Sequence, residues 1–286
     1  MSTEVQLPPT EHDQRHRRRH IIAVVVGALL SAALLVGLVL WIGRGADEVR
    51  VDDVLDRYRS TDPTATTSPE EAEGLRRPPP GVYTYDATGS ERLSVLDTAQ
   101  EWGPTMPATV THSADGCWTL RLDYNTNHWR EQEMCPQEGR LVERRSSGYQ
   151  AFDFGVLVEN TTVSDCEPPD LVLRLDAEPG DSWTTHCEGS SPEQGTTIVS
   201  DGTNTFVGVE ELEIGGRTVR ALHQRLQRTL SGDQQGTQDD HLWYAEADGL
   251  LLRAELSIRA ETPSPVGTVT YTESGEFQLS SLEPRS

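Results

Sequence analysis

The sequence predicts a mainly β protein that combines an N-terminal transmembrane helix with an exported, curved antiparallel sheet, half-barrel or barrel-like and stapled by disulfide bonds. Three observations predict this fold class. One apolar run covers residues 21–42, short alternating runs separated by turn residues fill the chain from Gly81 onward, and every cysteine lies beyond the apolar run. Alternation with a period of two is typical of strands with one buried face, and cysteines outside the cytosol form disulfide bonds.

The apolar run IIAVVVGALLSAALLVGLVLWI extends from Ile21 to Ile42 and contains no charged residue. At about 1.5 Å per residue it spans roughly 33 Å as a helix, enough to cross a bilayer. The arginine-rich flank HRRRH predicts that residues 1–20 form a basic cytoplasmic tail and that the C-terminal part is extracellular. A cleaved signal peptide is the alternative, but its apolar region is shorter, about 7–15 residues. We therefore expect an uncleaved, single-pass anchor in the cell membrane.

Charge and composition exclude several classes of function. The chain of 286 residues has a net charge of -22, and all 24 residues counted as Lys+Arg are arginine. An exported domain this acidic repels phosphate backbones, so no nucleic-acid partner is expected. Because the chain has no lysine, it cannot supply a P-loop lysine, a Schiff base or a Ser-Lys dyad.

Residues 43–80 have the composition of a juxtamembrane helix followed by a flexible stalk. Val51, Val54, Leu55 and Tyr58 recur at helical spacing, which predicts a short helix. A linker that is only transiently helical is the alternative. The segment after it is rich in Pro, Thr, Ser and Glu, a composition typical of an extended spacer.

The segment CWTLRLDYNTNHWREQEMC, from Cys117 to Cys135, predicts a disulfide-stapled β-hairpin. Its turn-prone centre is Asn-Thr-Asn. If the strands are symmetric about Thr126, Cys117 faces Cys135 within disulfide reach, and Arg121 faces Glu131. The opposite face must then be the buried one, and it carries Trp118, Leu120, Leu122 and Tyr124.

The remaining cysteines, Cys166 and Cys187, then pair by elimination. None of the four cysteines lies in a C-x-x-C spacing, so neither a zinc ribbon nor a thioredoxin-like site is indicated.

Residues 81–282 predict one extracytoplasmic β domain. A hairpin around Gly215-Gly216 would place Glu211 opposite Arg220, and another turns at Asp248-Gly249, a strong two-residue turn signal. No long helical period follows the stalk, so the sheet must curve or close to bury one face.

A resemblance adds to this interpretation. The order GVYTYDATGSERLSVL, DGCWTLRLDY, HWREQEMC, IGGRTVRAL and DHLWYAEADGLLLRAE resembles uncharacterised signal-anchored extracytoplasmic proteins of high-GC Gram-positive bacteria. The C-terminal part, IGGRTVRAL followed by LWYAEADGLLLR, is similar to envelope proteins related to the lipoprotein localisation factor. That second resemblance implies a half-barrel around an apolar groove that holds acyl chains.

No catalytic or metal site is indicated. The chain lacks G-x-S-x-G and H-E-x-x-H, and its exported histidines are scattered over predicted strands. His12, His16 and His20 recur at helical spacing, but as part of the basic flank of an anchor they require no metal. We expect no cofactor and no enzymatic activity.

Two functions remain. The first is a module that binds a lipid or another apolar envelope ligand on the concave face of the sheet. The alternative is a scaffold that binds a cell-wall or protein partner by its surface. Trp118, Trp183, Phe206 and Trp243 would pack in a core in a scaffold, or line a cavity of about 300–1,000 Å³ in a ligand module. The expected ligand-binding residues are Trp118, Leu120, Leu122 and Trp243.

Overall fold

The computed structural model describes residues 46–61, 75–96, 99–153, 157–192, 195–264 and 267–286. The chain divides into two units, and the described residues belong to the second, Gly45–Ser286. The expected cytoplasmic tail (1–20) and transmembrane helix (21–42) lie outside the described residues. Within the described ranges, no helix is long and apolar enough to cross a membrane.

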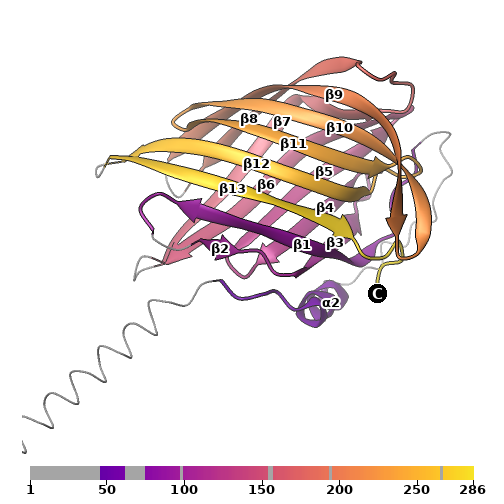
Figure 1. Cartoon of the computed structure of the whole chain (residues 1–286), viewed down its shortest axis with the longest axis horizontal. Helices are drawn as coiled ribbons and strands as arrows, with labels where there is room; N and C mark the ends of the chain where they lie inside the picture. Colours follow the sequence, from indigo (N-terminus) through magenta and orange to yellow (C-terminus); the bar gives the residue numbers. More distant parts are fainter. Residues whose placement is uncertain (1–45, 62–74, 97–98, 154–156, 193–194, 265–266) are drawn as a thin grey trace, which may run out of the picture. The chain divides into compact units, whose positions relative to one another are not determined.

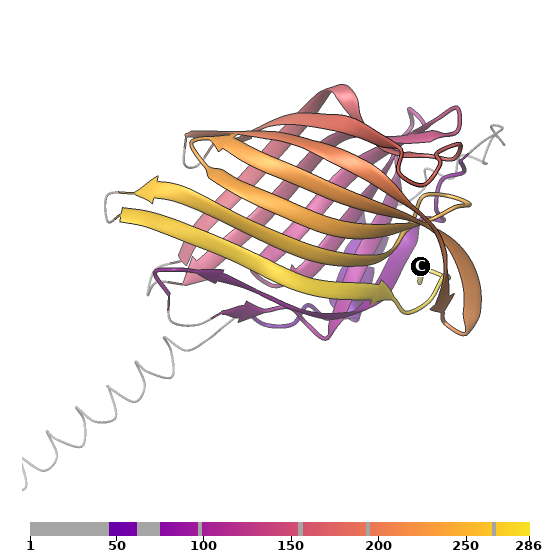
Figure 2. The same ribbon diagram turned by 45° about the horizontal axis from the view of Figure 1, so that its top comes forward.

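The described strands form one antiparallel sheet that closes on itself (Figures 1 and 2). Neighbours along the chain are neighbours in the sheet, and β1 pairs with β13 to complete the wall. The two-residue strand β2 pairs only with β1, so twelve strands form the barrel. The strands are β1 (Gly81–Leu93), β2 (Gln100–Glu101), β3 (Thr105–His112), β4 (Trp118–Asn125), β5 (His128–Gln137), β6 (Arg140–Asp153), β7 (Leu157–Arg174), β8 (Ser182–Ser191), β9 (Thr196–Ile214), β10 (Arg217–Gly232), β11 (Gln235–Ala245), β12 (Leu251–Ser264) and β13 (Gly267–Leu279).

Closure corrects the half-barrel that the resemblance implied. The first and last strands pair in register from Tyr85 with Leu279 to Leu93 with Tyr271. A closed barrel has no unpaired edge, which removes the aggregation hazard of an open sheet. The inward face of the sheet therefore encloses a lumen rather than lining an open groove.

The stapled hairpin is confirmed. Cys117 and Cys135 are bonded, and Arg121 lies opposite Glu131 in β4 and β5. The second predicted disulfide, Cys166 with Cys187, is also present. The expected buried face of β4 is buried, with exposed fractions of 0% for Trp118, 2% for Leu120, 4% for Leu122 and 1% for Tyr124.

Both predicted hairpin turns are confirmed. Glu211 pairs with Arg220 across β9 and β10, and the intervening Gly215 and Gly216 have φ values of 56° and 76°. This left-handed backbone is easily adopted only by glycine. The turn between β11 and β12 places Gly249 at φ 71°.

One end of the lumen is filled by apolar side chains and is called here the packed end. Trp118, Leu120, Leu141 and Leu173 belong to this core. Leu75, which precedes β1, is buried in the same cluster, and a methyl group on Gly249 would lie only 2.9 Å from its side chain. The segment before β1 thus helps to close the packed end.

The floor between this core and the rest of the lumen is built around Trp102. Its ring lies 4.9 Å from that of Tyr124 and 6.3 Å from that of Phe277. Gly89 and Gly275 pair across β1 and β13, and a methyl group on either would lie within 2.5 Å of the indole. The two glycines therefore make the space that the tryptophan occupies.

The helix expected from the spacing of apolar residues is α2 (Val51–Ser60). Its residues Val54, Leu55 and Tyr58 are buried and form a cluster with Val82 of β1. This part of the expected stalk is docked on the outer surface of the barrel, because its apolar face finds an apolar partner there.

The wall is weakest between β7 and β8. Only three residue pairs join these strands, from Val163 with Ser190 to Asp165 with Glu188. The disulfide Cys166–Cys187 continues this short ladder. Beyond the disulfide, a side chain bridges the two strands. The indole N–H of Trp183 in β8 donates a hydrogen bond to the backbone carbonyl of Leu171 in β7.

Candidate functional site

The part of the lumen beyond the floor is a cavity of about 590 Å³. This volume lies in the range of about 300–1,000 Å³ typical of small-molecule sites. The cavity reaches the surface at the end opposite the packed end, which is called here the mouth. Its lining residues Val95 and Val158 are 48% and 47% exposed there, and Leu157 beside them is 50% exposed.

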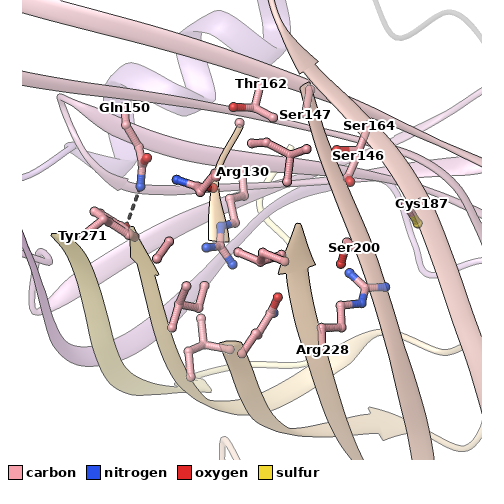
Figure 3. A pocket seen from close by; sticks show the side chains of 18 of the residues that line it. Arg130, Ser146, Ser147, Gln150, Thr162, Ser164, Cys187, Ser200, Arg228 and Tyr271 are labelled. Atoms are coloured by element: carbon pink, nitrogen blue, oxygen red, sulfur yellow. Dashed lines mark hydrogen bonds between the residues drawn. The ribbon is translucent and has the colours of Figure 1, made fainter. Parts of the chain in front are cut away.

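The cavity has two chemically different walls. The wall formed by β10 to β13 is mainly apolar, whereas the wall formed by β5 to β9 is rich in hydroxyl and amide groups; Figure 3 shows several of the latter. The apolar wall includes Leu226, Leu230, Leu242, Leu256, Ile258, Ala260, Val269 and Phe277. The polar wall includes Gln132, Ser146, Ser147, Gln150, Asn160, Thr162, Ser164, Thr185, Ser191, Thr196, Ser200 and Asn204.

Strand alternation sends charged side chains into the cavity. On β10, Arg228 shares the inward face with Leu226 and Leu230, because residues two apart lie on the same face of a strand. Gly202 of β9 is the direct partner of Arg228, and a methyl group there would lie 2.6 Å from the Arg228 side chain. The missing side chain lets the arginine lie across β9 toward β7.

Arg228 reaches Asp170 of β7. Its guanidinium donates to the Asp170 carboxylate at 3.1 Å, and the backbone N–H of His186 donates to the other carboxylate oxygen at 2.7 Å. Both charged side chains are largely buried, at 14% and 7% exposed. The two opposite charges cancel, so the pair is neutral overall. Together with the His186 N–H it ties β7 to β8 and β10, where the β7–β8 ladder is short.

A second buried network lies near Arg130. Its guanidinium donates to Glu273 at 2.8 Å. The Tyr271 hydroxyl lies 2.9 Å from the same carboxylate and 3.0 Å from that of Glu91, and His128 lies 3.3 Å from Glu91. Burial raises the pKa of Tyr271, and the adjacent negative charge of Glu273 raises it further, so this hydroxyl remains a hydrogen-bond donor.

Two lining carboxyls are harder to ionise than usual. Burial raises the pKa of Asp240 to about 6, although it accepts hydrogen bonds from Gln238 and from the backbone N–H of Ser257. Burial also raises the pKa of Glu143, which accepts a hydrogen bond from Gln132 at 2.9 Å. Asp240 and Glu143 are shielded from water, at 2% and 4% exposed, and desolvation disfavours the charged form of a carboxyl.

The raised pKa of Asp240 predicts a pH effect on stability. Between the ordinary carboxyl pKa of about 3.9 and the value of about 6, the folded protein binds more protons here than the unfolded chain. Stability from this group therefore falls as the pH rises through that interval. Relative to wild type, the free energy of unfolding of Asp240→Asn should increase over the same interval. Above that interval the difference should stay constant at roughly 3 kcal/mol. Chemical denaturation at a series of pH values measures this difference.

The control is the adjacent Asp239, which lies on the other face of β11. Its hydrogen bond with Arg225 lowers its pKa, so Asp239→Asn should lose stability, relative to wild type, as the pH rises. Parallel pH profiles for wild type and Asp240→Asn would contradict the assignment.

The structure separates the four residues expected to bind a ligand. Leu122 lines the cavity. Trp118 and Leu120 precede it on the inward face of β4, within the core of the packed end. Trp243 lies on the face of β11 opposite Leu242 and Tyr244, stacked 4.1 Å from the His223 ring, with the Arg253 guanidinium 4.9 Å from its own ring. Neither Trp183 nor Phe206 is among the lining residues.

The polar wall of the cavity was not predicted from the sequence, although one feature of the sequence indicated it. Arg228 interrupts the apolar phase of Leu226 and Leu230, and Asp240 shares the phase of Leu242. A charge on the inward face of an amphipathic strand indicates a lumen with polar contents. The β9 residues Ser200 and Asn204 carried no such signal, because polar residues also alternate on outward faces.

The described residues offer no convincing metal site. Both groups of potential ligands, one near Asp170 and one near Asp115, depend on cysteines that are bonded in disulfides. A disulfide removes the thiolate that binds metal.

No family model and no curated protein matches the chain. Among solved structures, it is similar to the hypothetical lipoprotein YmcC from Escherichia coli (K12), with 12% sequence identity and a TM-score of 0.33, over 78% of this chain and 95% of that chain.

Proposed function

We propose that the barrel is a non-enzymatic module that binds a lipid-like amphiphile in its lumen. The observation that carries this proposal is the cavity of about 590 Å³, with an apolar wall on β10 to β13 facing a polar wall on β5 to β9. A purely apolar ligand would leave the polar wall unsolvated, and a purely polar ligand would leave the apolar wall in contact with water. An amphiphile matches both walls.

The apolar wall can supply useful binding energy. Each methylene group removed from water contributes about 0.8 kcal/mol, so eight of them contribute roughly 6 kcal/mol before the cost of association. Val95, Leu157 and Val158 place exposed apolar surface at the mouth, where a chain entering or leaving would first make contact.

The polar wall offers a matched pair of substitutions to test this function. Thr162 lines the cavity from β7, whereas Thr161 on the same strand points to the outer face. Thr162→Trp should fill the cavity and lower the affinity for a fluorescent fatty-acyl probe at least about tenfold, the loss expected when apolar contacts worth roughly 1.4 kcal/mol are blocked. Thr161→Trp adds the same indole outside and should leave the affinity unchanged. Probe titration measures both.

Equal affinities for both variants, or no binding of the probe to wild type, would contradict lumenal binding. Native mass spectrometry of the protein purified from its own host provides a second test. A co-purifying small molecule that is lost in Thr162→Trp supports the proposal, and the surface-binding scaffold predicts none.

A further inference from the structure

Four polar side chains on adjacent strands form a patch on the cavity wall, called here the β8–β10 patch: Thr185, Ser200, Asn204 and Arg228. Ser200, Gly202 and Asn204 occupy successive inward positions on β9. Thr185 and Arg228 flank Gly202 as its direct partners on β8 and β10. Figure 3 shows Ser200 and Arg228 on the same side of the pocket.

Each of these side chains has a buried polar atom without a hydrogen-bond partner among the described residues. The atoms are the hydroxyl oxygens of Thr185 and Ser200, Oδ1 of Asn204 and Nε of Arg228. Thr185 and Asn204 are only 4% and 3% exposed. A buried polar group without a partner is costly, and four of those in the described residues gather on this one patch of the cavity wall, where a bound molecule can reach them.

We propose that the β8–β10 patch binds the head group of the amphiphile and that this head group is neutral and hydroxylated, such as a sugar or polyol. The proposal rests on the lumenal binding proposed above. Its chemistry follows from the donors and acceptors that the patch leaves open and from the charge around it.

The patch needs donors and acceptors at once. Arg228 Nε can only donate, and Asn204 Oδ1 can only accept. The orientation of the Asn204 amide is fixed because its Nδ2 donates to the carbonyl of Val172 at 2.8 Å. A fully ionised phosphate offers only acceptors and would leave Asn204 unpaired, whereas an ammonium group offers only donors and would leave Arg228 unpaired. A hydroxyl group does both.

Charge argues against an anionic head group. The positive charge of Arg228 is already balanced by Asp170. Among the lining residues the acids outnumber the arginines by five to two, with Glu131, Glu143, Asp170, Asp233 and Asp240 against Arg130 and Arg228. A further negative charge would be repelled by this excess of acids.

Three probes with the same dodecyl chain test the proposal below their critical micelle concentrations: dodecyl glucoside, dodecyl phosphate and dodecylamine. Wild type should bind the glucoside at least about tenfold more tightly than either charged probe, the difference expected for one or two unmatched hydrogen bonds. The variant Asn204→Leu removes the acceptor that dodecyl phosphate leaves unpaired, so this variant should lose the preference for the glucoside over the phosphate. Thr262→Val, which removes a lining hydroxyl on β12, is the control and should retain it.

The outcomes separate the two proposals. Failure of all three probes to bind would overturn lumenal binding itself. Binding of all three with equal affinity would show that water alone satisfies the patch, and the tightest binding by the phosphate or the amine would show a charged head group. Either result overturns this inference and leaves lumenal binding standing.

Discussion

Leu120→Asp is expected to unfold the barrel. The Leu120 side chain is 2% exposed and belongs to the apolar core of the packed end. An aspartate there would remove the apolar contacts of the leucine and bury an unpaired charge. Together these costs amount to about 5 kcal/mol or more, which is comparable with the whole stability of a typical domain, about 5–15 kcal/mol. Circular dichroism and denaturant titration measure the loss.

The matched variant is Leu230→Asp. Leu230 is an inward-facing leucine of β10, but it lines the cavity and is only partly buried. Water that enters the mouth can solvate a charge there, so we expect a stability loss below about 2 kcal/mol and weaker binding of an acyl probe. Similar stability losses for the two variants would contradict the division of the lumen into a packed end and a cavity that opens at the mouth.

The stapled hairpin shows what could be predicted from the sequence alone. The register of the stapled hairpin followed from Cys117, Arg121 and their partners, because a slip by one residue would destroy every match at once. It also predicted the buried face of β4 correctly. Local patterns of this kind specify which face of a strand is inward.

Local patterns could not specify where along β4 the core ends and the cavity begins. Trp118, Leu120 and Leu122 look alike in the sequence, yet only Leu122 lines the cavity. The boundary depends on Trp102, which fills the space above Gly89 and Gly275. These residues come from a connection and from the first and last strands, so their meeting follows from closure of the barrel.

Trp243 shows a second limit. It lies between Leu242 and Tyr244, and three consecutive apolar residues give no alternation from which an inward face can be predicted. The structure places Leu242 and Tyr244 along the cavity. Trp243 instead contacts a polar cluster, where its indole N–H donates to Glu210 at 2.8 Å.

The two disulfides are expected to contribute equally to the free energy of unfolding. Their removal should differ in how much it increases local opening of the barrel wall. They join residues 18 and 21 positions apart, and loops of such similar length predict a similar loss of about 3 kcal/mol for each in the chain-entropy model. Thermal unfolding of Cys117→Ser/Cys135→Ser and of Cys166→Ser/Cys187→Ser should therefore show comparable decreases in Tm.

Local opening should distinguish the two variants. Without Cys117–Cys135, β4 still pairs with β3 and β5 along most of its length. Without Cys166–Cys187, β7 and β8 keep only the three residue pairs from Val163 with Ser190 to Asp165 with Glu188. Hydrogen exchange at these residues should accelerate strongly in Cys166→Ser/Cys187→Ser and little in the other variant. Equal protection in both would mean that side-chain bridges such as Trp183 to Leu171 hold the wall closed without the disulfide. Faster exchange in Cys166→Ser/Cys187→Ser alone would show that this disulfide holds β7 and β8 together. These strands carry Asp170 and part of the β8–β10 patch, so the disulfide would then also maintain the polar wall of the cavity.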